Sequence, residues 1–207
     1  MKVLSLCLGM VQTNCYLLQN EDSKELIIVD PAENEAAITK RIEAMQAKPV
    51  AILLTHGHFD HIMAAKELRE AFHIPIYAHG AEKDVLADPN LNLSTMTGRT
   101  PYSLEADVYL KDGDEPDIPG FKFRVLHTPG HTHGSCCYYF YQDKVLISGD
   151  TLFCGSCGRT DFPTSSGKQM MESLKRLVTE LPGETAVYPG HEDTTTIAYE
   201  KRSNPFV

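Results

Sequence analysis

A dense cluster of histidine and aspartate side chains follows one apolar run of this sequence. Three histidines and one aspartate lie within six consecutive positions: His56, His58, Asp60 and His61. The preceding run 50–54 is entirely apolar, which predicts a buried strand that ends at Thr55. Gly57 gives the backbone freedom to turn at this point. Imidazole and carboxylate groups are ligands of Zn²⁺, Fe²⁺ and Mn²⁺, so the cluster predicts a metal site where the strand ends.

The spacing within this cluster divides it into two pairs. Alternate residues of an extended segment point the same way, so His56 and His58 can reach one metal together. Asp60 and His61 come one turn later, on the first turn of a predicted helix, and can serve a second metal beside the first. The alternative interpretation is a capping turn with surface histidines and no metal.

Length, charge and cysteine content narrow the class of protein. With 207 residues and 23.0 kDa, the chain fits a single domain over residues 1–207. The net charge of −9 disfavours a nucleic-acid binder, and no apolar run is long enough to cross a bilayer. Residues 1–18 predict a β-hairpin rather than a signal peptide, and the six cysteines predict free thiols. We therefore expect a cytoplasmic protein that binds neither membrane nor nucleic acid.

For the C-x-x-C pair Cys154 and Cys157, a redox or metal role is the alternative to a reduced turn.

Apolar periodicity predicts strands that alternate with helices. The expected elements are three short strands within 1–30, a helix over 33–47, a strand at 50–54, a helix over 61–72, a strand at 74–78, strands at 107–110 and 121–127, a hairpin of 136–142 with 144–149, a helix over 167–180 and a strand at 185–188. Residues 87–105 form a long loop of the kind that covers sites in enzymes. Met96 and Tyr102 either contact a substrate there or pack within the protein.

Three more candidate ligands follow glycine-containing turns in the second half of the chain. His131 follows Pro129-Gly130, Asp150 follows Gly149, and His191 follows Pro189-Gly190. For Asp150 a helix or turn cap is the alternative. Asp30, at the end of another strand, is either a hydrogen-bond acceptor for a ligand histidine or part of a turn.

Other histidines carry weaker signals. We expect His127 to be packed behind the site, and His133, His79 and His73 to be exposed. The chain repeats one arrangement four times, an apolar strand, a glycine-bearing turn and a candidate ligand, which predicts that these side chains converge. Strands with intervening helices predict an α+β protein with two sheets packed face to face and helices outside.

With these residues in hand, the chain resembles the metallo-β-lactamase superfamily. The HxHxDH motif of that family stands here as residues 56–61, and its later ligands as His131, Asp150 and His191. The resemblance covers essentially the whole chain and implies the four-layer αβ/βα sandwich. It also implies two metal sites and a bridge: His56, His58 and His131 for the first, Asp60, His61 and His191 for the second, with Asp150 between them. An aspartate at 150 favours the hydrolase branches over the β-lactamases themselves, where a cysteine is expected.

Within the superfamily, segments 155–163 and 203–206 are similar to short glyoxalase II-type hydrolases, which act on hydroxyacylglutathione thioesters. Arg159 falls where that branch places a basic residue near the thiol part of the substrate; a surface ion pair with Asp161 is the alternative. The sequence stops near residue 207, without the helical extension of full-length glyoxalase II. Asp161 and Asp193 also replace tyrosines that contact glutathione there. We therefore expect the chemistry to be kept with a different thiol carrier.

The resemblance implies a hydrolase in which a metal-bound hydroxide attacks a small thioester or a related ester. Asp60 would orient the hydroxide or take its proton. We expect one or two divalent ions, Zn²⁺ with Fe²⁺ or Mn²⁺ as alternatives, and the oligomeric state stays open. One rival function is a persulfide dioxygenase with a single iron held by His56, His131 and Asp150. The other is a metal-binding protein without turnover.

Overall fold

The first β-sheet takes its strands from the first half of the chain. In the computed structural model, which describes residues 1–207, its order is β1 (Lys2–Leu8), β2 (Thr13–Gln19), β3 (Glu25–Val29), β4 (Lys48–Leu53), β5 (Ile76–His79) and β6 (Val108–Leu110). The first three strands are antiparallel neighbours, and the pairs from β3 to β6 are parallel. Strand β2 is buried along its whole length, because both faces of the sheet are covered.

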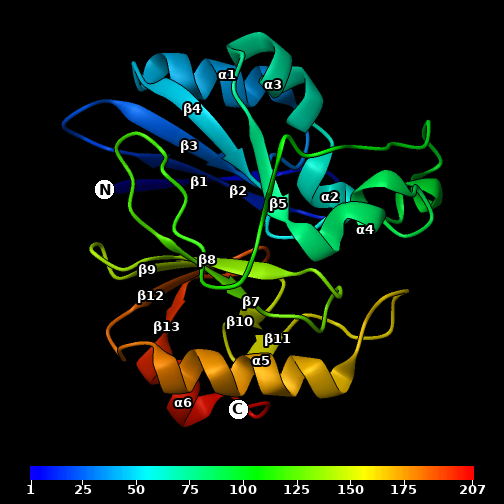
Figure 1. Cartoon of the computed structure of the whole chain (residues 1–207), viewed down its shortest axis with the longest axis vertical. Helices are drawn as coiled ribbons and strands as arrows, with labels where there is room; N and C mark the ends of the chain where they lie inside the picture. The colour runs from blue at the N-terminus through cyan, green and yellow to red at the C-terminus, as the bar shows by residue number, and fades with distance from the viewer.

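The second sheet is built by the second half of the chain. Its order is β13 (Thr195–Thr196), β12 (Ala186–Pro189), β9 (Val145–Gly149), β8 (Cys136–Phe140) and β7 (Arg124–His127). A separate two-stranded hairpin of β10 (Leu152–Phe153) and β11 (Ser156–Cys157) lies beside it. The two sheets pack face to face, with the termini on opposite layers (Figure 1).

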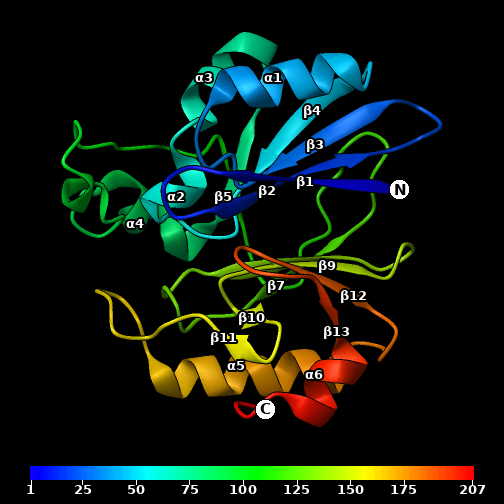
Figure 2. The same ribbon diagram turned by 180° about the vertical axis from the view of Figure 1, so that it is seen from behind.

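Helices cover the outer face of each sheet, as Figures 1 and 2 show from opposite sides. The first sheet carries α1 (Glu35–Ala44) and α3 (Ala65–Phe72), and the second carries α5 (Gly167–Glu180) and α6 (Ile197–Ser203). Four shorter elements lie at one end of the sandwich: α2 (Phe59–Ile62), η1 (Gly80–Glu82), α4 (Lys83–Ala87) and η2 (Ser94–Thr97). The four-layer αβ/βα arrangement confirms the predicted fold class.

Three apolar layers hold these elements together, and β2 shows why. Its side chains alternate between the two faces of the sheet. Cys15 and Leu17 belong to the apolar cluster under α1 and α3, whereas Tyr16 and Leu18 belong to the cluster between the sheets. A third cluster, which includes Met170, packs α5 and α6 against the second sheet. The alternation of side chains along β2 therefore makes this strand part of both apolar clusters, the one under the helices and the one between the sheets.

Most predicted elements are confirmed, and two predictions are wrong. The expected helix over 61–72 is broken into α2 and α3, because the N–H of Ala64 bonds to the carbonyl of Pro31 and the chain turns there. His79 is buried rather than exposed, because its ring stacks on that of His127 with centroids 4.0 Å apart. Elements α4, β10, β11, β13 and α6 were not expected. None of the helices combines the length and the apolar character needed to span a bilayer.

Candidate metal centre

All seven candidate ligands lie at one end of the sandwich, where strands from both sheets end. His56 and His58 follow β4, Asp60 and His61 lie on α2, and His131, Asp150 and His191 follow β7, β9 and β12. Their ligand atoms form three overlapping groups with all separations within 4.8 Å: His56, His58 and His131; His56, His61 and Asp150; and Asp60, His61 and His191. The structure thus brings together the residues that the sequence placed in two sites and a bridge.

The carboxylate of Asp150 touches both groups of histidines. Nδ1 of His58 lies 2.8 Å from Nε2 of His131, and the ring of His56 meets both rings edge-on. Oδ1 of Asp150 is 3.4 Å from Nε2 of His61, and its Oδ2 is 3.5 Å from Nε2 of His131. One carboxylate therefore stands between the groups, which is the position a bridging ligand requires.

Unpaired buried atoms show that this cluster suits a cation. The Nε2 atoms of His56, His58 and His61 and Oδ1 of Asp150 are buried without a hydrogen-bond partner. A buried polar atom without a partner costs about 1–3 kcal/mol, and His56, His61 and Asp150 lie close enough to share one partner. Imidazole nitrogens and carboxylate oxygens are typical ligands of divalent metals, so the residues fit the group.

The protonation states of the cluster also suit metal binding. Burial lowers the pKa of His56 well below its ordinary value and, with the adjacent His131, lowers that of His58 to about 3. Burial alone would raise the pKa of Asp150, but His61, His131 and a third histidine outweigh it and lower the value to about 2. At neutral pH His56 and His58 therefore offer neutral imidazole lone pairs, and Asp150 offers an anionic carboxylate. Burial alone would lower the pKa of His61, but Asp60 and Asp150 outweigh it and raise the pKa well above its ordinary value, so a metal would displace a proton there.

Asp30 orients two of the histidines from behind. Its Oδ2 accepts from Nδ1 of His61 at 3.0 Å and from the Thr55 hydroxyl at 2.6 Å, and that hydroxyl lies 3.2 Å from Nδ1 of His56. Because both Nδ1 atoms face acceptors, both Nε2 atoms are left free for the cluster. The expectation that Asp30 accepts from one of these histidines is confirmed.

Glu82, on η1, is a buried carboxylate that the sequence did not reveal. Its Oε1 accepts from the N–H of Gly57 at 2.8 Å, and its Oε2 accepts from the hydroxyl of Thr132 at 2.9 Å. Gly57 lies between two candidate ligands and Thr132 follows a third, so one side chain joins the two loops. A Cβ at Gly134 would lie 2.3 Å from Oε2 of Glu82, which shows how closely the second loop approaches. An acidic residue among Gly80, Ala81 and Lys83 carries no sign of burial in the sequence.

The start of β2 supports the cluster from the opposite side. The hydroxyl of Thr13 donates to Oδ2 of Asp60 at 2.8 Å. The amide of Asn14 donates to the carbonyls of Pro189 and Glu192 at 3.1 and 3.0 Å, and these flank the third strand-end histidine. Sequence reasoning missed both residues, because their partners lie far along the chain.

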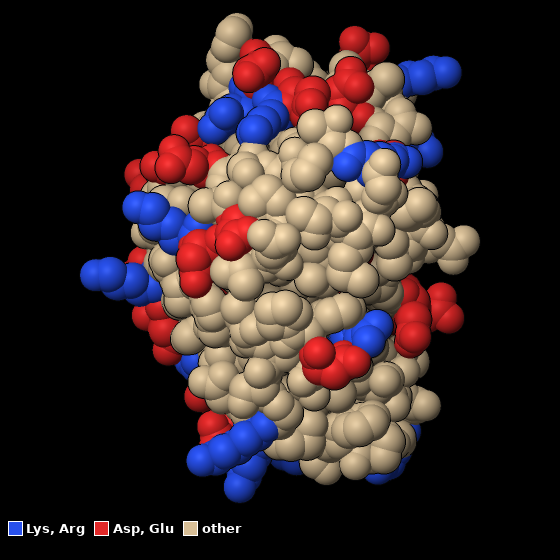
Figure 3. Space-filling model, turned by 90° about the vertical axis from the view of Figure 1, so that its right-hand side faces the viewer, with Lys and Arg blue, Asp and Glu red and all other residues tan.

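A cavity of about 400 Å³ opens directly over the cluster. Five candidate ligands form its floor: His58, Asp60, His131, Asp150 and His191. Its walls include Phe153, Ser156, Cys157, Arg159 and Phe162. The face that carries α4 and the neighbouring loop is largely uncharged in its middle, with charged side chains toward its margins (Figure 3). Phe153 and Phe162 add two aromatic faces to the wall, so the cavity suits a ligand with apolar parts.

Arg159 forms the ion pair with Asp161 that was the alternative interpretation, and it also lines the cavity. Its guanidinium makes two hydrogen bonds to Asp161, at 2.7 and 2.6 Å, and lies 4.1 Å from the ring centroid of Phe162. It also lines the cavity, and its backbone carbonyl faces Nδ1 of His131 at 2.8 Å. The exposed ion pair contributes little stability, so the guanidinium can exchange Asp161 for another anion at low cost.

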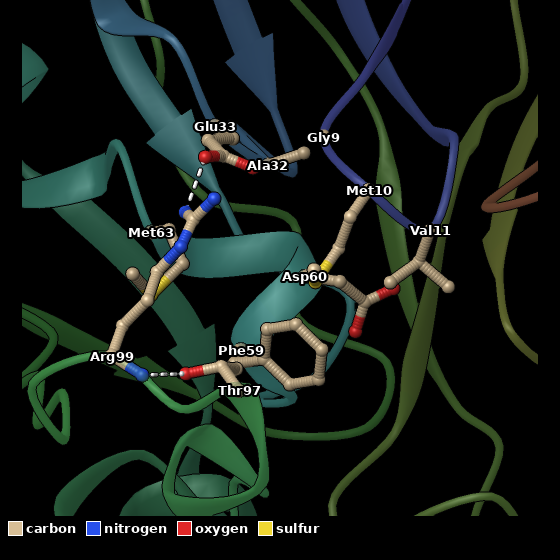
Figure 4. A pocket seen from close by; sticks show the side chains of 10 residues that line it. All are labelled: Gly9, Met10, Val11, Ala32, Glu33, Phe59, Asp60, Met63, Thr97 and Arg99. Atoms are coloured by element: carbon tan, nitrogen blue, oxygen red, sulfur yellow. Dashed lines mark hydrogen bonds and ion pairs between the residues drawn. The ribbon is translucent and has the colours of Figure 1, made fainter.

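A second crevice lies on the other side of Asp60, and Figure 4 shows its lining. Met10, Met63 and Phe59 form its apolar part, and Arg99 is ion-paired with a glutamate at its outer edge. Its volume is only about 10 Å³, close to that of one water molecule. The cavity on the Arg159 side is therefore the one with room for a substrate.

The remaining candidate residues do not line the cavity over the cluster. Met96 is 73% exposed and does not line it, and the hydroxyl of Tyr102 accepts from the N–H of Lys66. His127 is packed, as predicted, with Nε2 2.9 Å from the carbonyl of His133. The ring of His133 is partly exposed and bonds to Asp84.

A family model described as the metallo-beta-lactamase superfamily matches residues 8–191. The chain belongs to the metallo-beta-lactamase superfamily. Two curated relatives match it almost end to end. The Bacillus subtilis protein YqgX, a probable metallo-hydrolase, is 38% identical over 208 residues, which is 100% of this chain and 98% of the relative. Hydroxyacylglutathione hydrolase GloC of Haemophilus influenzae is 35% identical over 202 residues, covering 95% and 93%.

Solved structures of metallo-beta-lactamase superfamily proteins agree closely in fold. The structure of BLEG-1, described as a B3 metallo-beta-lactamase, has a TM-score of 0.94 and 42% identity over 99% of both chains. A protein in a di-iron-bound form has a TM-score of 0.88 and 35% identity, covering 99% and 100%. ETHE1 from Myxococcus xanthus has a TM-score of 0.82 and 30% identity, covering 99% and 84%. This chain is a metallo-hydrolase of the superfamily, and its cluster implies divalent metal ions.

Proposed function

We propose that this protein hydrolyses small thioesters of the hydroxyacylglutathione type, or of a related thiol, in the cytoplasm. The observation that carries the proposal is the placement of the cluster at the floor of a cavity large enough for a substrate, with Asp150 between its two halves. The similarity to GloC along nearly the whole chain supports the same reaction. We expect His56, His58 and His131 to hold one ion, and Asp60, His61 and His191 to hold a second.

The side chains divide the work of such a reaction. Divalent metals, when bound, acidify water and polarise a carbonyl group. Asp60 faces the cavity, and the hydroxyl of Thr13 fixes its carboxylate, so it can orient the attacking water or accept its proton. A thiol has a pKa near 8.5 and leaves as a thiolate, so no strong general acid is needed. Arg159 and Phe162 offer a cation and an aromatic face to the thiol part of the substrate.

The direct test is thioester hydrolysis by protein loaded separately with Zn²⁺, Fe²⁺ or Mn²⁺. The substrates are S-lactoylglutathione and the same acyl group on an uncharged thiol, with released thiol detected by a chromogenic disulfide. We expect Asp60→Asn to lower kcat by about 100-fold or more, with metal content reported alongside. Absence of turnover with every metal and every thiol would overturn the proposal.

A second candidate is oxidation of a thiol persulfide by a single iron. The structural likeness to ETHE1 at 30% identity favours it. His56, His131 and Asp150 would then hold the iron, and Nε2 of His131 lies 3.5 Å from Asp150 Oδ2. An oxygen electrode distinguishes the two functions, because only the dioxygenase reaction consumes oxygen. Oxygen uptake with a glutathione persulfide would identify persulfide oxidation, and not thioester hydrolysis, as the main reaction.

A third candidate is hydrolysis of β-lactams. The 42% identity to BLEG-1 favours it, whereas Asp150 stands where the sequence resemblance predicts a cysteine for β-lactamases. Assays of the same metal-loaded preparations with a chromogenic cephalosporin and with the thioesters compare β-lactam hydrolysis with thioester hydrolysis. Turnover of the cephalosporin that exceeds that of every thioester would make the β-lactam the preferred substrate class. Loss of all three activities would leave a metal-binding protein without turnover.

A further inference from the structure

A buried residue of the C-terminal helix α6, Glu200, and the residue that caps this helix, Asn204, hold the tip of the β10–β11 hairpin. Glu200 is fully buried, and its carboxylate accepts from the N–H of Gly155 at 3.0 Å and from the hydroxyl of Thr195 at 2.5 Å. The amide nitrogen of Asn204 donates to the carbonyl of Ser156 at 2.9 Å and to Glu200 at 2.8 Å. The C-terminal segment thus forms hydrogen bonds with the backbone of two consecutive hairpin residues, Gly155 and Ser156.

The hairpin needs this support because it is very short. Each strand has two residues, and only two pairs are in register, Leu152 with Cys157 and Phe153 with Ser156. A hairpin of this size is at best marginally stable without packing partners. Glu200 and Asn204 lie under its turn and supply hydrogen bonds that the strands themselves do not make.

The same hairpin forms one wall of the cavity over the cluster. Phe153, Ser156 and Cys157 line the cavity, and the ring of Phe153 lies 6.0 Å from that of His191. The next residue, Gly158, passes so close to the Asp150 backbone that a Cβ would lie 2.0 Å from its carbonyl oxygen. A shift of the hairpin therefore changes the wall of the cavity, while His61 and Asp60 stay held by Asp30 and Thr13, which lie outside the hairpin.

We propose that Glu200 and Asn204 are positioning residues for substrate binding, which act by fixing the hairpin wall of the cavity. This inference rests on the proposed thioester hydrolysis at the same site. Because neither residue contacts a candidate ligand, their loss affects the fit of the substrate more than the bond-breaking step. The sequence segment 203–206 thereby has a physical role at the site, although it lies on the outer layer of the fold (Figure 2).

The test compares four variants with the wild-type protein. Asn204→Asp has the same shape but turns an oxygen toward two acceptors, the Ser156 carbonyl and Glu200. Glu200→Ala removes all three accepted hydrogen bonds. Glu200→Gln keeps an acceptor for Gly155, and its amide can donate to the hydroxyl of Thr195, so it is the conservative control. Lys201→Ala alters an exposed residue of the same helix.

We expect Asn204→Asp and Glu200→Ala to raise KM for the thioester by about 5-fold or more, with kcat within about 2-fold of wild type. Metal content stays unchanged, and backbone hydrogen exchange over 153–157 accelerates. Glu200→Gln and Lys201→Ala stay within about 2-fold of wild type in both constants. If Asn204→Asp does not fold, Asn204→Ser removes the amide without adding charge and carries the same expectation.

Two results would overturn the inference. One is unchanged hydrogen exchange and unchanged KM in the first two variants. The other is a joint loss of kcat and metal content, which would mean that α6 acts through the ligands. Wild-type protein without any thioesterase activity is a different outcome and counts against the proposed function. In that case the exchange rates of 153–157, and the KM for whichever substrate is turned over, decide the role of the two residues.

Discussion

The carboxylate of Glu82 accepts a hydrogen bond from the backbone N–H of Gly57, with nitrogen and oxygen 2.8 Å apart. Its other oxygen accepts from the hydroxyl of Thr132 at 2.9 Å. The loop with His56 and His58 and the loop with His131 are therefore joined through one buried side chain. This bridge spans segments that are 75 residues apart and sets their separation.

Replacement of Glu82 by leucine is expected to weaken metal binding. The N–H of Gly57 and the hydroxyl of Thr132 would be left buried without a partner, and the two loops would separate. We expect zinc affinity to fall by about 10-fold or more. Competition with a chromophoric chelator measures it. Glu82→Gln, which can still accept from Gly57, should stay close to wild type; equal affinities in wild type and Glu82→Leu would contradict this role.

Glu82 should also make the stability of the metal-free protein depend on pH. Burial raises the pKa of its carboxyl from 4.5 to about 7. The folded state therefore binds this proton more tightly than the unfolded state, so the contribution of Glu82 to stability is greatest below pH 4.5 and is lost as the pH rises through about 7. The loss amounts to at most about 3 kcal/mol. Urea unfolding between about pH 5 and 8 measures it, and Glu82→Gln should remove this part of the slope. Parallel curves for the two proteins would contradict the expectation.

Asp30 is expected to control metal affinity without touching the metal. In Asp30→Asn, an amide NH₂ replaces either Oδ2, which accepts from Nδ1 of His61 and from the hydroxyl of Thr55, or Oδ1, which accepts from the backbone N–H of Thr55. Asparagine tolerates the left-handed backbone at this position, where φ is 47°, so the fold should persist. We expect metal affinity to fall by about 10- to 100-fold. Glu33→Gln, a carboxylate that contacts Arg99 instead, is the matched control. Unchanged metal content after dialysis would argue against this role.

The convergence of the candidate ligands was predictable from the sequence because they lie in or directly after glycine-containing turns at the ends of apolar strands. His131, Asp150 and His191 are far apart in the chain, but parallel and antiparallel strands of one sandwich bring their ends to one edge. Apolar strands and the turns that follow them are local patterns, which can be read directly from a sequence. The helix over 167–180 was predictable for the same reason, since its apolar stripe is continuous and the structure has α5 at those bounds.

The supporting residues were not predictable, because their roles depend on partners distant in the sequence. Glu82 and Thr13 are ordinary polar residues until Gly57 and Asp60 lie beside them. His79 looked exposed because nothing near it in sequence suggests stacking on His127, which comes from the other sheet. Helix α6 is seven residues long and too short for a clear periodic signal. Tertiary contacts therefore decided each of these cases.

Gly190 is expected to be indispensable for the cluster, because the chain passes directly against two of its members. A Cβ at this position would lie 2.2 Å from Oδ1 of Asp150 and 2.7 Å from Cε1 of His61. Asp30 holds His61 from behind, and the Asp150 carboxylate lies among the histidines of the cluster, so neither side chain can move away without disturbing the cluster. We expect Gly190→Ala to lose metal from the half that contains His61, which elemental analysis measures, and to lower the thermal midpoint. Gly167→Ala, whose Cβ would meet only the hydroxyl of Thr160 at 3.4 Å, should retain its metal. Full metal content in Gly190→Ala would show that Asp150 and His61 can shift without loss of the ion.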